Sequence, residues 1–259
     1  MKTLRSNYLE SLAAFAVGGG GVVEEFPGIK CFRSPVNYIG FNRAFVLDRK
    51  GVGVEVLRQL QRFYREGDAA SWTLTVTPDM TDLLDRVMKQ LRVAEWQRSP
   101  NMILRREKAA FGEAPPELKV EPAKTPAELR EAMSIVTAAG NYSPGLFEGL
   151  ATHETLRQPG LTVLVGRVDG KAVATSSANT AHEVAGVHLV ATLKEHRGRR
   201  YGEAITAAAA KIGFSSGCRM SSLQASNVGY PVYFRLGYRH VFDFHSWVIK
   251  RDAPEVNGA

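Results

Sequence analysis

The sequence predicts an α+β protein whose chain forms two tandem lobes. Residues 1–110 show, in order, the patterns of a helix, two strands, a helix, a strand, a helix and a strand. Residues 118–252 show a similar succession of strands and helices. Between them, residues 111–117 combine a glycine and a Pro-Pro pair with charged side chains, which is typical of a linker. We therefore expect two domains of similar element order.

The composition is that of an ordinary globular protein, since 44% of the 259 residues are hydrophobic and 23% are charged. No stretch approaches the ~20 apolar residues of a membrane span, and Glu10 interrupts the apolar run that a signal peptide needs. We expect a cytoplasmic protein without a membrane partner. Cys31 and Cys218 could pair arithmetically, but their positions in opposite halves favour two buried free thiols. The six histidines are scattered, so no metal site is expected.

The formal net charge of +7 raises the question of a nucleic-acid partner. The basic residues are spread along the chain, without an aromatic-interleaved basic stripe or a zinc-finger pattern. Their one concentration is residues 194–200. We therefore expect a small polyanionic ligand at that point and no nucleic acid.

Periodicity and turn residues give the expected elements of each lobe. In the first lobe we expect helices at 4–17, 54–65 and 79–91 and strands at 22–32, 36–47, 70–77 and 96–106. In the second lobe we expect helices at 125–139, 199–215 and 229–236, a short helix ending at 156, and strands at 118–122, 161–168, 171–181, 183–193, 220–225 and 239–250.

Both lobes contain a strand that runs through a glycine loop into a helix. In the second lobe the loop holds Arg197, Gly198, Arg199, Arg200 and Gly202. A helix N-terminus offers free backbone N–H groups and the positive end of the helix dipole, and glycine lets a ligand approach closely. This combination suits a phosphate or pyrophosphate, although an ordinary basic strand-to-helix turn would share it.

The first-lobe loop carries the opposite charge at its start. Gly51 and Gly53 have Gly-x-Gly spacing, but Asp48 stands where the second loop has Arg197. A carboxylate there would repel phosphate. We therefore expect a degenerate copy of the loop that binds no such ligand.

Known phosphate loops differ from the second-lobe loop. A P-loop would continue with Lys-Ser or Lys-Thr after its last glycine, whereas Glu203 and an alanine follow Gly202. A Rossmann motif would need a third glycine. The loop resembles the acyl-CoA loop of the GCN5-related N-acetyltransferases (GNAT), which has the spacing Arg/Gln-x-x-Gly-x-Gly/Ala. Arg197 and Gly202 occupy the first and last positions of this spacing, and Arg200 stands at the middle glycine.

A second stretch strengthens this resemblance. Tyr233, Leu236, Gly237 and Tyr238 match the Tyr-x-x-x-Gly-Phe/Tyr ending of the last helix in that family. The resemblance covers roughly residues 118–250. It implies two GNAT-like lobes, each a mixed, mostly antiparallel sheet flanked by helices, of which the first is degenerate.

The resemblance also implies which residues bind acetyl-CoA, the expected cosubstrate. The backbone of the strand before the loop would hold the pantetheine arm, the loop would hold the pyrophosphate, and residues before the last helix would complete the site. The implied set is Val190, Ala191, Thr192, Leu193, Arg197, Gly198, Arg199, Arg200, Tyr201, Gly202, Ser226 and Asn227. Strand alternation places His188, Val190 and Thr192 on one face of the sheet.

Acyl transfer to an amine needs a base for the amine and a proton for the leaving thiolate. The resemblance implies that Tyr233 is the general acid, and His188 is a candidate base because imidazole titrates near neutral pH. Each could instead be a plain core residue. We expect an N-acetyltransferase acting on a small-molecule or peptide amine, with residues 141–145 near the acceptor. The alternative is an acyl-CoA-binding module without turnover, and no feature indicates an oligomeric state.

Overall fold

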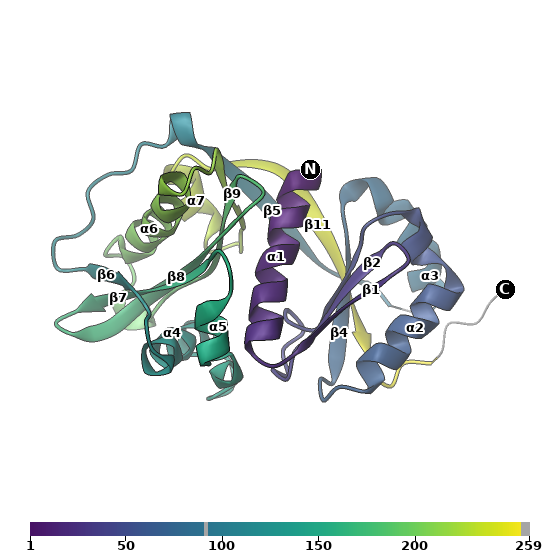
Figure 1. Ribbon diagram of the computed structural model, residues 1–259. Helices are drawn as coiled ribbons and strands as arrows, with labels where there is room; N and C mark the ends of the chain where they lie inside the picture. The colour runs from purple at the N-terminus through teal and green to yellow at the C-terminus, as the bar shows by residue number, and fades with distance from the viewer. Residues whose placement is uncertain (91–92, 255–259) are drawn as a thin grey trace. The chain divides into compact units, whose positions relative to one another are not determined.

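The computed structural model describes residues 1–90 and 93–254, which divide into two compact units (Figure 1). Unit 1 comprises Met1–Gly18 and Asn101–Val241, and unit 2 comprises Gly19–Pro100 and Phe242–Ala259. The units are therefore not contiguous in sequence, unlike the predicted lobes 1–110 and 118–252. The reason is that the first helix packs within unit 1, while the end of the last strand pairs within unit 2.

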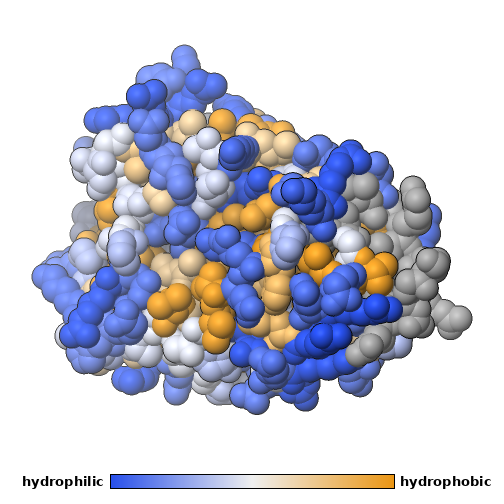
Figure 2. Space-filling view, turned by 45° about the vertical axis from the view of Figure 1, so that its right-hand side comes forward, coloured by the Kyte–Doolittle hydropathy of each residue, from blue (hydrophilic) through white to orange (hydrophobic). Residues whose placement is uncertain are grey.

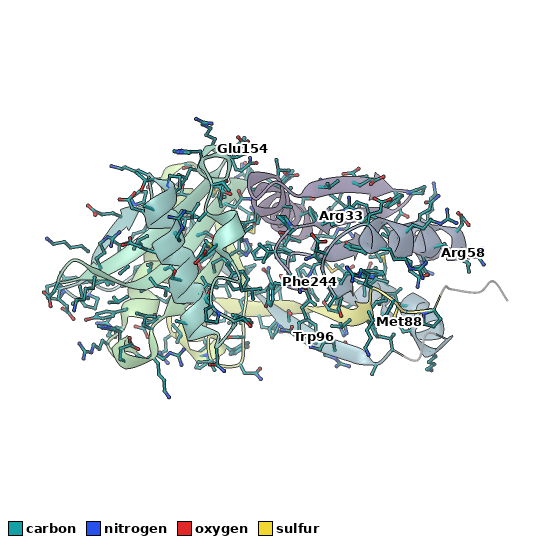
Figure 3. All side chains as sticks on the ribbon, turned by 90° about the horizontal axis from the view of Figure 1, so that it is seen from below. Arg33, Arg58, Met88, Trp96, Glu154 and Phe244 are labelled. Atoms are coloured by element: carbon teal, nitrogen blue, oxygen red, sulfur yellow. The ribbon has the colours of Figure 1, made fainter. Side chains whose placement is uncertain are left out.

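Unit 2 is a mixed sheet of order β1-β2-β3-β4-β11, in which only β3 and β4 among these neighbours run parallel. Its elements are β1 (Val22–Phe26), β2 (Ile29–Arg33), β3 (Arg43–Val46), α2 (Val54–Arg65), β4 (Ser71–Val76), α3 (Thr81–Gln90) and part of β11 (Arg239–Lys250). Apolar side chains of α2, α3 and the sheet form one core, including Leu60, Trp72 and Met88. Figure 3 shows Arg33, whose guanidinium lies 4.6 Å from the ring centre of Phe63 on α2.

Two strand predictions in unit 2 are wrong. The predicted strand 22–32 is a hairpin, because Pro27 and Gly28, with φ of 76° at Gly28, turn the chain between β1 and β2. The predicted strand 36–47 is reduced to β3. Its first half is a loop held by the buried Asn42, whose side chain donates to the carbonyl oxygens of Val36 and Tyr38. The predicted helix 79–91 corresponds to α3, and Leu91 lies outside the described residues.

Unit 1 contains a sheet of order β5-β10-β9-β8-β7-β6, antiparallel except between β9 and β10. Its elements are α1 (Lys2–Gly18), the end of β5 (Glu95–Arg105), β6 (Lys119–Pro122), α4 (Pro126–Ala139), α5 (His153–Arg157), β7 (Leu161–Val168), β8 (Lys171–Ala181), β9 (Val184–Thr192), α6 (Tyr201–Ser215), β10 (Met220–Gln224) and α7 (Tyr230–Arg235). The predicted α+β class, with mostly antiparallel sheets and flanking helices, is confirmed.

Local sequence explains where the elements of unit 1 begin and turn. Thr125 caps α4, because its side chain accepts from the N–H of Glu128 while the Glu128 carboxylate accepts from the N–H of Thr125. Asp169 and Gly170, with φ of 49° and 77°, form the turn between β7 and β8. The predicted elements of this half of the chain lie close to the observed ones because such signals are local.

Helices cover both faces of the unit 1 sheet. Ala185 of β9 faces α6, since a side chain at Gly213 of α6 would collide with its Cβ at 2.1 Å. The next residue, Gly186, faces α1, since a Cβ there would lie 2.3 Å from Oδ1 of Asn7. Successive residues of a strand point to opposite faces, so α6 and α1 lie on opposite sides of β9.

The side chain of Asn7 fastens α1 to the sheet. It is fully buried, and its Nδ2 donates to the carbonyl oxygens of Asn179 (3.0 Å), Ala181 (3.2 Å) and Val184 (3.0 Å). These carbonyls surround the turn between β8 and β9. These hydrogen bonds therefore connect α1 directly to the end of the β8–β9 hairpin.

The surface in Figure 2 is dominated by hydrophilic side chains, with apolar ones in small groups between them. Among the described residues, none of the helices combines the length and apolar character that a membrane crossing requires. Cys31 and Cys218 are both buried and unpaired. Burial raises the pKa of both thiols, which keeps them protonated.

We predict that Asn7→Ala lowers the free energy of unfolding by about 2–3 kcal/mol, because it removes the buried hydrogen bonds that connect α1 to the β8–β9 turn. Ser6→Ala on the same helix is the control and should change it by less than about 0.5 kcal/mol. Urea denaturation of both variants measures the difference. Equal stability of the two variants would show that α1 is held by its apolar contacts alone.

Candidate functional site

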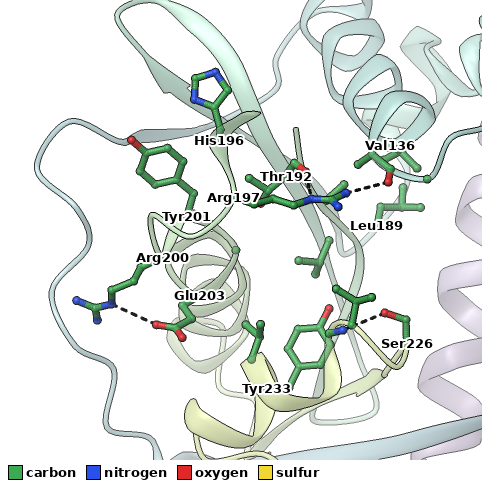
Figure 4. Close-up of a pocket in the computed structure, with 18 of the residues that line it drawn as sticks. Val136, Leu189, Thr192, His196, Arg197, Arg200, Tyr201, Glu203, Ser226 and Tyr233 are labelled. Atoms are coloured by element: carbon green, nitrogen blue, oxygen red, sulfur yellow. Dashed lines mark hydrogen bonds and ion pairs between the residues drawn. The ribbon is translucent and has the colours of Figure 1, made fainter. Parts of the chain in front are cut away.

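The cavity of unit 1 lies where β9 and β10 separate. The two strands are paired in register over only Met220↔Val184, Ser221↔Ala185 and Ser222↔Gly186, although β9 continues to Thr192. Beyond this point a cavity of about 590 Å³ is lined by residues 189–192 of β9, by the start of α6 and by α7 (Figure 4). The backbone of β9 therefore faces the cavity at the position where a neighbouring strand would otherwise pair with it.

A β-bulge shapes β9 beside the cavity. Thr175 of β8 is opposite Ala191 and Ser177 is opposite His188, so Leu189 and Val190 together oppose a single residue. Leu189 has φ of 51°, a left-handed conformation that is uncommon for a residue with a branched side chain. Bulges redirect side chains and interrupt pairing, and this one lies in the cavity wall.

The bulge overturns the predicted alternation of His188, Val190 and Thr192. Val190 packs against the core on the α6 side, and Thr192 Oγ1 lies 3.6 Å from the position of a Cβ on Gly202 of α6. His188 instead faces α1, where its Nε2 lies 2.8 Å from Ser11 Oγ. The prediction is wrong because one extra residue in the strand reverses the facing of everything after it.

The His188 side chain is half-buried in the contact between β9 and α1. Its ring lies 5.7 Å from the ring of Tyr8 on α1, and burial lowers the pKa of the imidazole to about 4. The imidazole is therefore neutral at physiological pH. His188 is not among the residues that line the cavity, so the structure does not bring the predicted base to the predicted acid.

The loop after β9 presents backbone donors to the cavity. Lys194–His196 form a short 3-10 turn, and Gly198 and Arg200 then adopt φ of 78° and 62° before α6 begins. Among the described residues, the backbone N–H groups of residues 198–203 have no backbone acceptor. Unsatisfied N–H groups at a helix N-terminus form a site for an anion.

Arg200 occupies a position where glycine would be favoured. Its left-handed backbone conformation costs roughly 1–2 kcal/mol for a residue with a Cβ, yet the loop still makes its turn. The guanidinium Nε of Arg200 lies 3.2 Å from Glu203 in the first turn of α6. The backbone thus takes a left-handed conformation with an arginine at this position, and the arginine adds a charged side chain to the cavity.

The Arg197 side chain lines the cavity and is hydrogen-bonded to two backbone carbonyl groups. Its Nε donates to the carbonyl oxygen of Thr192 (3.2 Å), and its Nη2 donates to that of Ala139 at the end of α4 (3.0 Å). Figure 4 shows the side chain crossing the cavity wall between these two elements. Arg197 thus connects the end of β9 to the C-terminus of α4. A positive charge at a helix C-terminus is stabilising, because it interacts favourably with the negative end of the helix dipole.

Tyr233 enters the cavity from α7 at the other side. Only 7% of the residue is exposed, and burial raises the pKa of its hydroxyl to about 12. Ser226 organises the entry to this helix, because its Oγ accepts from the N–H of Gly229 at 3.1 Å. Ser226 thus closes the turn before α7, whose N-cap residue is Gly229.

Most of the predicted site residues meet at this one cavity. Those that line it are Val190, Ala191, Thr192, Arg197, Gly198, Arg200, Tyr201, Gly202, Ser226 and Tyr233. Leu193, Arg199, Asn227 and His188 are not among its lining residues. Of the predicted acceptor segment 141–145, only Tyr142 lines it.

The sequence reasoning missed several lining residues, above all Glu203 and Arg235. Glu203 directly follows Gly202, and Arg235 lies two residues after Tyr233. Both stand inside the stretches that were singled out, so their proximity to the site could have been noticed. That the two side chains meet depends on the packing of α7 beside α6, which sequence spacing does not reveal.

The sequence of residues 130–238 matches the model of a family described as the acetyltransferase (GNAT) family. Unit 1 contains a GNAT domain. Every residue that lines the cavity lies within the matched segment. The GNAT resemblance inferred from the loop and the Tyr233 stretch is thereby confirmed, while the degenerate character of the first lobe stays a prediction.

Solved structures share the fold of this chain at low sequence identity. A GCN5-related N-acetyltransferase from Kribbella flavida has a TM-score of 0.69 at 18% identity, over 93% of this chain and 94% of that one. A GCN5-related N-acetyltransferase from Sphaerobacter thermophilus has a TM-score of 0.62 at 15% identity, over 89% and 78%. A tandem GNAT protein from the clavulanic acid biosynthesis pathway has a TM-score of 0.59 at 15% identity, over 82% and 76%. A comparison with curated proteins finds no match.

The corresponding loop of unit 2 differs in its local hydrogen bonding. The Oδ1 of Asp48 accepts from the backbone N–H of Lys50 at 2.8 Å, in the 3-10 turn Arg49–Val52 that precedes α2. The chain's own carboxylate thus uses a donor that the equivalent loop of the GNAT domain leaves open. Within residues 1–90 and 93–254, no group of three or more His, Cys, Asp or Glu side chains could hold a metal ion.

We predict that Gly202→Val lowers the affinity for CoA on the order of tenfold or more, because its side chain would occupy space at the N-terminus of α6. A Cβ at this position meets only Thr192 Oγ1 at 3.6 Å, an ordinary contact, so the fold should tolerate the change. Gly202→Ala is the graded control and should lose less affinity. Calorimetric titration with CoA measures both, and unchanged affinity in the valine variant would place the ligand elsewhere.

Proposed function

We propose that unit 1 is an N-acetyltransferase that moves the acetyl group of acetyl-CoA to the amine of a small-molecule or peptide acceptor. The observation that carries this proposal is that one cavity joins an anion-binding helix N-terminus to a buried tyrosine hydroxyl. The first suits the diphosphate of a nucleotide, and the second suits a leaving group that must gain a proton. The GNAT domain supports acyl transfer as the class of reaction.

The residues of the cavity fit this cosubstrate. The backbone donors of residues 198–203 and the cation of Arg200 would hold the phosphates, while the unpaired side of β9 at residues 189–192 would hold the amide-bearing arm. Bound in this way, acetyl-CoA supplies an acyl group on a good leaving thiolate. The protein's part is to fix the thioester beside Tyr233 and to keep water away from it.

In this proposal the amine attacks as the free base, a nitrogen–carbon bond forms and the carbon–sulfur bond breaks. The proton of the amine passes to water, and Tyr233 donates its hydroxyl proton to the departing sulfur and regains one from solvent. Burial, which raises the pKa of Tyr233, equally disfavours a charged thiolate and makes the sulfur a stronger base. His188 is left out of this scheme because its side chain faces α1.

The alternative function is an acyl-CoA-binding module without turnover. It is favoured by the position of His188, since no imidazole base reaches the cavity from β9. Thiol release from acetyl-CoA in the presence of a panel of amines distinguishes the two functions. Binding of CoA without amine-dependent thiol release would support the binding module.

We predict that Tyr233→Phe lowers kcat on the order of 10²-fold with little change in CoA affinity, because the hydroxyl acts only as the thiolate leaves. The hydroxyl is the acid form, which is present below its pKa of about 12 and lost above it. The loss should therefore be constant between about pH 6 and 10. Tyr238→Phe, whose hydroxyl lies 2.6 Å from Ser221, is the matched control. Full activity of the Tyr233 variant would assign thiolate protonation to solvent.

We also predict that the full-length chain binds one CoA, because the loop of unit 2 is occupied by its own Asp48 carboxylate. Calorimetric stoichiometry measures this directly. Asp48→Asn should leave the stoichiometry unchanged, because the asparagine Oδ1 can still accept the hydrogen bond from the Lys50 N–H. Two CoA per chain would contradict the prediction that the first lobe is degenerate.

A further inference from the structure

A group of three charged side chains in the cavity wall is not explained by the GNAT motif. Glu203 in the first turn of α6 accepts from Arg200 through Oε2 at 3.2 Å, and both Nε and Nη2 of Arg235 lie 2.8 Å from its Oε1. Glu203 is 16% exposed at its side chain, whereas Arg200 and Arg235 are 62% and 60% exposed. A largely buried carboxylate thus holds two exposed guanidinium groups.

The placement of this group concerns the proposed phosphate site. All three residues line the cavity, and Glu203 stands one residue after Gly202, at the same helix N-terminus that offers free N–H groups. Figure 4 shows the side chains of Arg200 and Glu203 pointing toward each other. Both arginines therefore donate hydrogen bonds to a carboxylate of the chain itself, through atoms that could also bind a phosphate.

We propose that Glu203 is an internal counterion that sets the affinity for the cosubstrate, and that Arg235 is a phosphate-binding residue beyond the loop motif. This inference rests on the proposed function. A phosphate group offers the same kind of acceptor as a carboxylate and carries more charge, so it competes with Glu203 for the arginines. The guanidinium ends of both pairs are exposed and can turn to a phosphate, but the largely buried carboxylate that they leave opposes this exchange and repels the bound phosphates at short range.

Arg235 gives this exchange a second consequence. It belongs to α7, two residues after Tyr233, while Glu203 belongs to α6. When Arg235 turns from Glu203 to a phosphate, the helix that carries the proposed acid becomes fastened to the cosubstrate itself. Phosphates bound at one side of the cavity thereby help to hold the hydroxyl at the other.

The test is calorimetric titration of the full-length protein with CoA. Glu203→Gln should bind CoA about 3- to 10-fold more tightly than the wild type, because a charge is removed near the phosphates and both arginines are released. Glu131→Gln is the matched control. Glu131 pairs with Arg167 outside the cavity, so its removal changes the net charge equally and should change affinity less than about twofold.

Arg235 is tested independently. Arg235→Gln should weaken CoA binding about 3- to 10-fold. Arg239→Gln is the control and should leave CoA binding unchanged, because the guanidinium of Arg239 stacks on the ring of Phe234 at 4.4 Å. The loss from Arg235→Gln should be larger in the Glu203→Gln background, because the arginine is no longer diverted. If the changes in CoA binding free energy from the two substitutions are additive in the double variant, the proposal that Glu203 and the phosphates compete for Arg235 is overturned.

The outcomes separate this inference from the proposed function. A wild-type protein that binds no CoA would contradict the function itself. A wild-type protein that binds CoA, together with a Glu203→Gln variant that binds it equally or more weakly, would overturn the role of Glu203 and show that the carboxylate orients the arginines for the ligand.

Discussion

The separation of β9 from β10 is the constraint on which the site depends. Two parallel strands that stayed paired to their ends would satisfy their backbone groups and leave no opening. Here the pairing ends at Gly186 and Ser222, and the bulge at Leu189 turns the rest of β9. Bulges increase local twist and interrupt ladders, so the opening is built into the strand. The loop, the start of α6 and α7 then close around the gap.

The opposite face of the same strand explains why the bulge can persist. Ser177 of β8 donates to the carbonyl oxygen of His188 at 3.3 Å, and Ser11 of α1 contacts the ring of His188. With Asn7 bound across the nearby turn, α1 covers this side of the strand. A left-handed residue is retained only where its surroundings hold it. The histidine that looked catalytic in the sequence is thus placed to support the strand beside the cavity.

The two units show that a similar order of elements permits different local chemistry. Both contain a strand, a glycine loop and a helix. In unit 2 the loop is closed by Asp48 on the N–H of Lys50, whereas in unit 1 the donors of residues 198–203 remain open and arginines surround them. The difference lies in the backbone as well as in the side chains, because Gly53 has φ of −68° and donates to the carbonyl of Lys50, whereas Gly198 and Arg200 are left-handed. Function is therefore argued from the site and not from the fold.

The sequence by itself determined the features that rest on local signals. Thr125 and Glu128 fix the start of α4, Asp169 and Gly170 fix a hairpin, and the spacing from Arg197 to Gly202 fixes the loop before α6. These depend on residues that are close along the chain. The α+β class followed from such signals, and the resemblance to the GNAT family pointed to most of the predicted residues that line the cavity.

Only the tertiary structure decided what depends on residues far apart in sequence. The bulge in β9 arises from its register with β8, so strand alternation misplaced His188. The first helix belongs to unit 1 because of its packing there, and the end of the last strand belongs to unit 2 because β11 pairs with β4. Glu203 and Arg235 meet because α7 packs beside α6. The periodicity of one segment does not reveal which strand or helix it packs against. That neighbouring element determines the bulge, the composition of the units and the contact between Glu203 and Arg235.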